Sequence, residues 1–172
     1  KQEPYVDSVE IKRVLPNKIE INVTERERNF SLEFLNGYAY INNQGYILEI
    51  SNDKAGLPVL QGAVTPEEEI KAGNRLQKED LEKLGTVIRI MDLCKANGLD
   101  SLITSIDMSD KNDYSIYMEQ EKKTVYLGDE SNLGDKILWV QPILEDNKGI
   151  EGEIYVNGDL NNDFKPRFKP KV

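Results

Sequence analysis

Two segments within the first 25 residues alternate apolar and polar side chains with a period of two. The apolar positions are Val9 and Ile11 in one segment and Ile19, Ile21 and Val23 in the next. Because successive side chains of a β-strand point to opposite faces, we expect one face of each segment to lie on a core. Pro16-Asn17-Lys18 separates the segments with residues typical of turns. The sequence therefore predicts a β-hairpin over residues 6–14 and 19–25.

Strand patterns continue in the next part of the chain. Residues 30–35, 38–41 and 46–50 are rich in apolar and aromatic side chains, and the turn-forming segments Asn36-Gly37 and NNQG (residues 42–45) separate them. This spacing predicts an antiparallel meander. We expect the following GLPVLQG (residues 56–62) to lead the chain away from the sheet.

Three segments have features of helices. Thr65-Pro66-Glu67-Glu68 predicts a helix from about Pro66, since proline suits the first helical position. The spacing of Leu84, Ile88 and Met91 predicts a longer helix over residues 78–97 that packs on the sheet and stops at Asn97-Gly98. A third helix fits residues 132–140, and Pro142 should end or kink it.

The second half adds strands at residues 102–108, 114–118, 124–128 and 151–158. Beyond them, we expect the tail (residues 162–172) to start as a strand and fray, because Pro166 and Pro170 cannot donate to a ladder. The order of elements predicts an α+β fold with a mostly antiparallel sheet and about three helices.

Composition excludes several functions. With 31 acidic and 22 basic residues the net charge is −9, which repels phosphate backbones and anionic lipid surfaces. The absence of histidine removes the usual general base and the commonest metal ligand. The lone Cys94 cannot form an internal disulfide and fits the inner face of a helix. The chain has no apolar run of about 18 residues or more, so we expect a soluble piece of a longer protein.

Three groups of acidic or aromatic residues are candidate sites. Residues 159–163 (DLNND) resemble the start of a calcium loop, but Phe164 and Pro170 stand where that loop needs glycine and glutamate. Asp107, Asp110 and Asp113 could serve a glycoside hydrolase, or simply lie at a hairpin tip, which we favour. Tyr114, Tyr117 and Tyr126 fit cross-strand packing better than a sugar platform. We expect no cofactor, no metal site and no catalytic residues.

Several motifs occur in an order that is similar to one bacterial family. VEIKRVLP (residues 9–16) and IEINVTER (residues 19–26) are followed by NQGYIL (residues 43–48) and LPVLQG (residues 57–62). The segment TVYLGDESNLGDKILWVQPIL (residues 124–144) and the strand IEGEIYV (residues 150–156) come later, with Tyr155 where that family has an aspartate. These motifs resemble the extracytoplasmic region of the DivIB/FtsQ cell division proteins.

The resemblance implies two domains. Residues 1–26 correspond to the C-terminal hairpin of a partial POTRA domain, and residues 27–172 to the β domain with its fraying tail. At their junction we expect Glu25 and Arg26 to pair across the joint and fix the orientation of the two units.

The resemblance also implies a non-enzymatic scaffold of the divisome. Such a protein is anchored in the cell membrane by a single helix, lies outside the cytoplasm at the septum, and binds FtsL and DivIC/FtsB to help regulate septal peptidoglycan synthesis. In this family the partner adds a strand near the end of the β domain. By position, that edge includes residues 153–157 and 164–168, and the candidate partner-binding residues are Glu153, Tyr155, Asn157, Phe164 and Phe168.

Two alternatives come from other functional classes. One is a cell-wall hydrolase or sugar-binding enzyme that uses the acidic hairpin around Asp107. The other is a calcium-dependent adhesion module built on residues 159–163.

Overall fold

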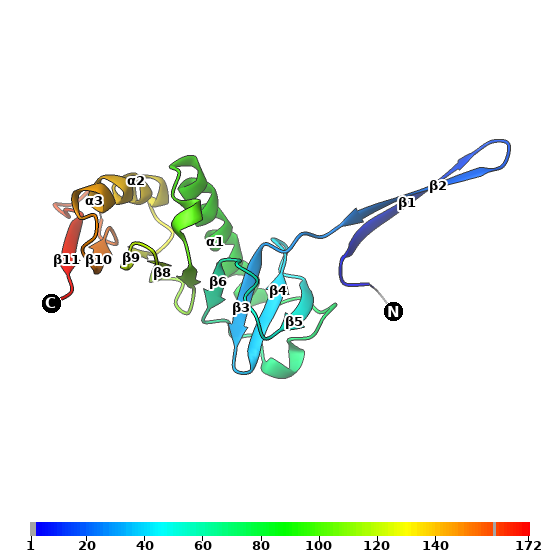
Figure 1. Ribbon diagram of the computed structural model, residues 1–172, viewed down its shortest axis with the longest axis horizontal. Coiled ribbons are helices and arrows are strands. Elements are labelled where there is room, and N and C mark those ends of the chain that lie inside the picture. Colours follow the sequence, from blue (N-terminus) through cyan, green and yellow to red (C-terminus); the bar gives the residue numbers. More distant parts are fainter. Residues whose placement is uncertain (1–2, 160) are drawn as a thin grey trace.

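The computed structural model describes residues 3–159 and 161–172 and places them in two separate sheets. The small sheet is the predicted hairpin of β1 (Val6–Val14) and β2 (Lys18–Glu25). The large sheet has nine strands in the order β11-β10-β9-β8-β7-β6-β3-β4-β5. Figure 1 shows the hairpin projecting from one end of the molecule and β11 at the other end. The predicted α+β class with a mostly antiparallel sheet is confirmed.

The first antiparallel part of the large sheet is the predicted meander. It consists of β3 (Phe30–Phe34), β4 (Gly37–Ile41) and β5 (Ile47–Ser51). Gly37 and Gly45 have φ values of 152° and 76°, which suits the turns that the sequence indicates at these positions.

The prediction that residues 56–62 leave the sheet is wrong. Residues 59–61 form β6 (Val59–Gln61), which pairs in parallel with β3 on one side and with β7 (Ser105–Asp107) on the other. Leu60 is completely buried. Only three residues join this ladder, and the flanking Pro58 and Gly62 look like loop residues in the sequence. This short strand connects the meander to the rest of the sheet.

The second antiparallel part continues from β7 through β8 (Tyr114–Met118) and β9 (Lys123–Gly128), as predicted. The strand β10 (Gly152–Tyr155) then pairs in parallel with β9, and β11 (Arg167–Pro170) pairs with β10 in antiparallel. The prediction placed a strand at the start of the tail and a frayed end after it. In the structure, turn residues come first and the strand follows them.

Helices cover one face of the large sheet (Figure 1). The helix α1 (Lys78–Ala96) agrees with the prediction, although Leu84, Val87, Ile90 and Cys94 are its most buried apolar residues, whereas Ile88 and Met91 are only partly buried. Burial raises the pKa of the Cys94 thiol to about 12, and the nearby charge of Asp100 adds to the shift. This agrees with an inert core cysteine.

The other helical segments are short. The helix expected from Pro66 is only a single 3-10 turn, Glu67–Glu69, and a second such turn follows at Asp100–Leu102. The third predicted helix is bent into α2 (Leu133–Leu138) and α3 (Val140–Asp146), with Pro142 in the first turn of α3, where its missing N–H costs nothing. No helix among the described residues is long and apolar enough to cross a membrane.

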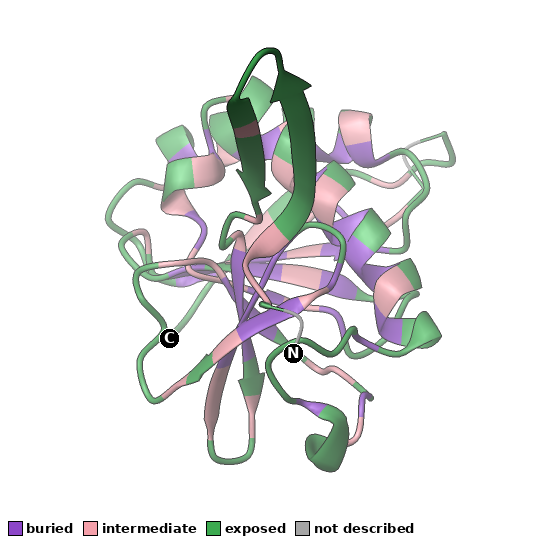
Figure 2. Ribbon diagram, turned by 90° about the vertical axis from the view of Figure 1, so that its right-hand side faces the viewer, coloured by how far each residue is buried: buried purple, intermediate pink, exposed green. Residues whose placement is uncertain are grey.

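The hairpin is predicted correctly, but its burial is not. Its apolar residues share one face, because Val9 lies opposite Val23 and Ile11 opposite Ile21. That face is open in the described chain, where Ile11 is 67% and Ile21 62% exposed. Figure 2 shows the contrast between the exposed hairpin and the buried strands behind it.

Candidate partner-binding edge

The last strand of the chain forms one edge of the nine-stranded sheet. β10 lies between β9 and β11, and β11 has no further strand beside it among the described residues. Of the expected edge, residues 153–155 therefore lie on an inner strand, where residues 167–169 pair with them, whereas Arg167 and Phe168 lie on the edge strand itself. The edge position belongs to β11.

Phe168 fixes β11 on the sheet. Its side chain is partly buried and packs against the apolar core beside Ile154. The ring lies so close to Gly152 that a side chain there would meet it at 2.6 Å. The ammonium group of the buried Lys123 lies 5.8 Å from the ring centre, within the range of a cation–π contact. The sheet thus accepts Phe168 because position 152 is glycine.

The opposite face of this part of the sheet carries a cluster of polar aromatic groups. The rings of Tyr126 and Tyr155 stack with their centres 5.0 Å apart. Tyr155 donates a hydrogen bond of 2.6 Å to Glu153, and the guanidinium of Arg167 lies 5.1 Å from the centre of the Tyr155 ring. The hydrogen bond to Glu153 is the main cause that raises the pKa of Tyr155. Both tyrosines therefore stay neutral donors at physiological pH.

Asn157 and Phe164 lie just beyond β10. Asn157 is exposed and packs its backbone against Gly128, while Phe164 lies against Gly158. Two of the five predicted binding residues, Glu153 and Tyr155, thus share the open face, whereas Phe168 points to the core side of the edge strand. The binding role of all five stays a prediction.

The acidic residues on which the hydrolase and calcium alternatives depend lie in local turns. Asp107 accepts a hydrogen bond from the backbone N–H of Ser109, Asp110 from that of Asn112 and Asp159 from that of Asn161. This pattern is typical of aspartate in turns. The described residues contain no group of three or more carboxylates or thiols placed to hold a metal ion, and residue 160 of the calcium-like segment lies outside them.

At the other end of the molecule, Arg26 anchors the base of the hairpin. Its side chain donates hydrogen bonds to the carbonyls of Pro4 and Val6, and its guanidinium lies 4.1 Å from the centre of the ring of Tyr46, the residue that precedes β5. Its Nε lies 3.5 Å from Asp7, which is an ion pair without hydrogen-bond geometry. Arg26 thus contacts Asp7 and an aromatic ring, whereas Glu25 is exposed. The role of both residues in orienting the two units stays a prediction.

A second group joins the hairpin to the strands β4 and β5. Tyr5 donates a hydrogen bond of 2.6 Å to Glu49, and Arg28 forms an ion pair of 3.1 Å with the same carboxylate. The Arg28 guanidinium also lies 5.4 Å and 5.0 Å from the ring centres of Tyr5 and Tyr40. We call Tyr5, Arg26, Arg28, Tyr46 and Glu49 the joint.

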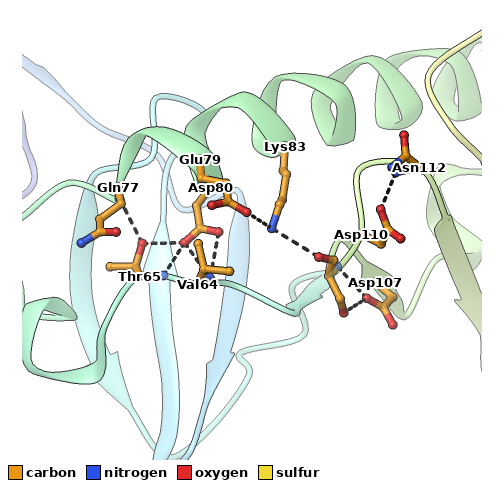
Figure 3. A network of polar contacts seen from close by, with 10 residues as sticks. Val64, Thr65, Gln77, Glu79, Asp80, Lys83, Asp107, Asp110 and Asn112 are labelled. Carbon is orange, nitrogen blue, oxygen red and sulfur yellow. Dashed lines mark hydrogen bonds and ion pairs between the residues drawn. The ribbon is translucent and has the colours of Figure 1, made fainter.

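The sequence did not reveal a buried polar network at the start of α1, which Figure 3 shows. Asp80 is completely buried and accepts hydrogen bonds from the backbone of Val64 and from the backbone and hydroxyl of Thr65. Thr65 Oγ1 also accepts a bond from the backbone N–H of Gln77. Asp80 thus holds the segment after β6 to the helix. Its donors lie 15 or 16 positions away, so no local signal points to it.

A groove of about 1400 Å³ lies beside this network, between α1 and the turns that precede β8 and α2. Lys83 is almost fully buried in its wall and contacts Glu79 at 3.2 Å and the carbonyl of Ser109 at 3.4 Å. Arg89 pairs with Glu130 at 3.7 Å across the groove. Side chains of opposite charge thus pair in the walls of the groove.

Two protein families match the chain. The family described as "Cell division protein FtsQ/DivIB, C-terminal" matches residues 33–157, and "POTRA domain, FtsQ-type" matches residues 1–26. The POTRA match covers the hairpin, and the C-terminal match covers the large sheet from within β3 to β10. β11 lies beyond the matched residues.

Three curated relatives are named "Cell division protein DivIB". The protein of Clostridium tetani is 25% identical over 90% of this chain and 58% of its own length, and that of Clostridium acetobutylicum is 27% identical over 91% and 61%. A protein of Clostridium botulinum strain Hall is 29% identical over 66% of this chain and 44% of its own length. The chain thus spans roughly half the length of these relatives. With more than half of its residues matched by the C-terminal domain, it belongs to the FtsQ/DivIB family of bacterial cell division proteins.

Proposed function

We propose that the chain is the extracytoplasmic part of a divisome scaffold that binds FtsL-like and DivIC/FtsB-like proteins through the edge of β11. The observation that carries the proposal is the free edge of a nine-stranded sheet in a member of this family. An exposed edge offers unpaired backbone groups to an incoming strand. Binding there would hold the partner ectodomains together and so help regulate septal peptidoglycan synthesis.

The proposed role needs no catalysis. The chain has no histidine, and the carboxylates that an enzyme would use at Asp107 and Asp110 accept hydrogen bonds from their own turns. The scaffold would be anchored in the cell membrane by a single helix outside these residues and concentrated at the septum.

Two domains would meet at the joint. We place the boundary after Arg26, with the hairpin as the end of a POTRA domain and residues 27–172 as the β domain. The POTRA match ends at residue 26, and the hairpin forms a sheet of its own. Its apolar face would pack on the other elements of the POTRA domain, since apolar faces of this kind mark contact surfaces.

A titration tests the interface. The chain is titrated with the soluble segments of an FtsL-like and a DivIC-like partner, and Tyr155→Ala is compared with Tyr117→Ala, a matched tyrosine two strands away on β8. Tyr155→Ala should weaken binding about tenfold or more, because the Tyr155 ring contacts Arg167 of the edge strand and aromatic residues dominate the energy of interfaces. Tyr117→Ala should leave it unchanged.

Phe164→Ala serves as a second probe near the edge. If Tyr155→Ala and Phe164→Ala both bound like the wild type while circular dichroism showed an intact fold, the predicted interface residues would be wrong. Turnover of purified peptidoglycan by the chain, lost in Asp107→Asn, would instead support the hydrolase alternative.

A further inference from the structure

The direction of the backbone groups along β11 follows from its neighbours. The N–H groups of Gly152 and Val156 bond to carbonyls on the β9 side, at Lys122 and Tyr126. The backbone N–H and C=O groups of the odd-numbered residues along β10 must then face β11. The backbone N–H of Lys171 indeed donates a hydrogen bond to the carbonyl of Glu151. Since N–H and C=O of one residue point to the same side of an antiparallel strand, Arg167 and Lys169 face β10.

The residues in between face the free edge. These are Pro166, which directly precedes β11, Phe168 and Pro170. Proline has no N–H, so over residues 166–170 Phe168 supplies the single outward donor, while all three residues still offer carbonyl acceptors. The free edge is therefore rich in acceptors and poor in donors.

We propose that Pro166 and Pro170 reserve this edge for a foreign strand and prevent pairing between two copies of the chain. Two antiparallel strands without proline, paired at these three positions, would exchange roughly six main-chain hydrogen bonds, because each outward residue donates one and accepts one. Two copies of β11 centred on Phe168 place each proline opposite a proline and retain roughly two of these bonds. A partner strand without proline supplies its own donors and retains about four.

Side-chain charge acts in the same direction. Lys165, Arg167, Lys169 and Lys171 follow each other at alternate positions in an otherwise acidic chain. In a pair of edges centred on Phe168, Arg167 of one copy would lie opposite Lys169 of the other, and this contact between like charges disfavours the pairing. The inference concerns the choice between a copy and a different strand, so it would stand even if the partner were not a division protein.

The test uses the chain itself as the probe. In the double variant P166V/P170V, valine restores both outward N–H groups without touching the bonds to β10. Three mixtures are compared by sedimentation: wild type alone, labelled wild type with excess unlabelled variant, and variant alone. Relative to wild type alone, we expect the association constant to be about fivefold or more higher for wild type with the variant. For the variant alone it should be about thirtyfold or more higher. Pro142→Ala in α3 is the matched control and should change nothing.

Amide hydrogen exchange separates this edge from other contacts. The Phe168 amide should become protected in step with association, whereas association through the hairpin would leave it exposed. The Lys169 amide, which faces β10, reports whether β11 is still in place. If Lys169 stays protected but the three mixtures associate equally and Phe168 exchanges freely, the prolines do not control the edge and the proposal is wrong.

Discussion

At the scale of single residues, Asp80 has the most demanding environment. A buried carboxylate is unfavourable unless hydrogen bonds compensate for its lost hydration. Asp80 receives such bonds from the backbone of Val64 and Thr65 and from the Thr65 hydroxyl. It also lies in the first turn of α1, where the helix dipole favours a negative charge. One side chain thereby connects β6 to the helix that covers the sheet.

Asp80→Ala should lower the free energy of unfolding by about 2–4 kcal/mol, because it leaves buried backbone donors without acceptors. Urea unfolding, followed by the fluorescence of the single Trp139, measures the loss. Asp92→Ala, an exposed aspartate on the same helix, should change stability by less than about 0.5 kcal/mol. Equal effects of the two substitutions would show that the Asp80 network contributes no more than a surface charge.

At the scale of elements, the joint connects the hairpin to the large sheet. Arg26 connects hairpin carbonyls to the Tyr46 ring, and Tyr5 and Arg28 both bind Glu49 on β5. These contacts come from three segments and restrict rotation about the short connection between β2 and β3. We propose that they hold the two units in one orientation.

Tyr5→Phe should make the hairpin more mobile, with a loss of about 0.5–1.5 kcal/mol from the missing hydrogen bond to Glu49. NMR relaxation of amides in β1 and β2 measures the mobility. Burial, and next the hydrogen bond to Glu49, raise the pKa of Tyr5 above 10.0. The neutral hydroxyl therefore stabilises the joint below pH 10 and loses this effect as the pH rises through the raised value.

The variant provides the control for this pH effect. Wild type should approach the mobility of Tyr5→Phe above pH 10, while the variant itself should respond less to pH. A wild-type hairpin as mobile as that of the variant at pH 7 would contradict the role of Tyr5 in the joint.

The elements also show which structure can be predicted from the sequence. The hairpin, α1 and the strands β3–β5 and β8–β9 have periodic patterns and turn residues of their own, so local rules identify them. β6 has three residues, and its partners β3 and β7 are distant in the chain, so only tertiary pairing makes it a strand. The tail strand is predicted too early in the chain for a related reason, because its prolines indicate fraying although they occupy the outward positions that an edge strand tolerates.

The candidate site was predicted with similar limits. The resemblance predicts an interface near the end of the β domain, and Phe168 of that prediction lies on the edge strand β11. Which residues of β11 direct their N–H groups to the free edge, however, depends on how β9, β10 and β11 align. No single segment encodes that register. The partners of Arg26 were missed because Tyr46 lies about 20 positions away.

At the scale of the whole molecule, the two proposed contact surfaces lie at opposite ends (Figure 1). The apolar face of the hairpin projects from one end, and the free edge of β11 lies at the other. The hairpin belongs to a separate sheet, so its exposed apolar residues contribute little to the stability of the nine-stranded sheet.

Ile21→Glu should therefore leave the unfolding free energy of the large sheet within about 0.5 kcal/mol of wild type and reduce self-association through the hairpin face. By contrast, Leu32→Ala at a completely buried position of β3 should cost about 2–5 kcal/mol. Urea unfolding by Trp139 fluorescence and sedimentation measure the two properties. If Ile21→Glu destabilised the sheet as much as Leu32→Ala, the hairpin would be part of its core.

The central claim is that a partner strand pairs with the free edge of β11. Amide hydrogen exchange with and without the soluble segment of a DivIC-like partner tests it most directly. Strand addition predicts strong new protection of the Phe168 amide and unchanged protection of Lys169, whose N–H already faces β10. If the partner bound but the Phe168 amide exchanged as fast as in the free chain, the partner would bind elsewhere and the account would be wrong.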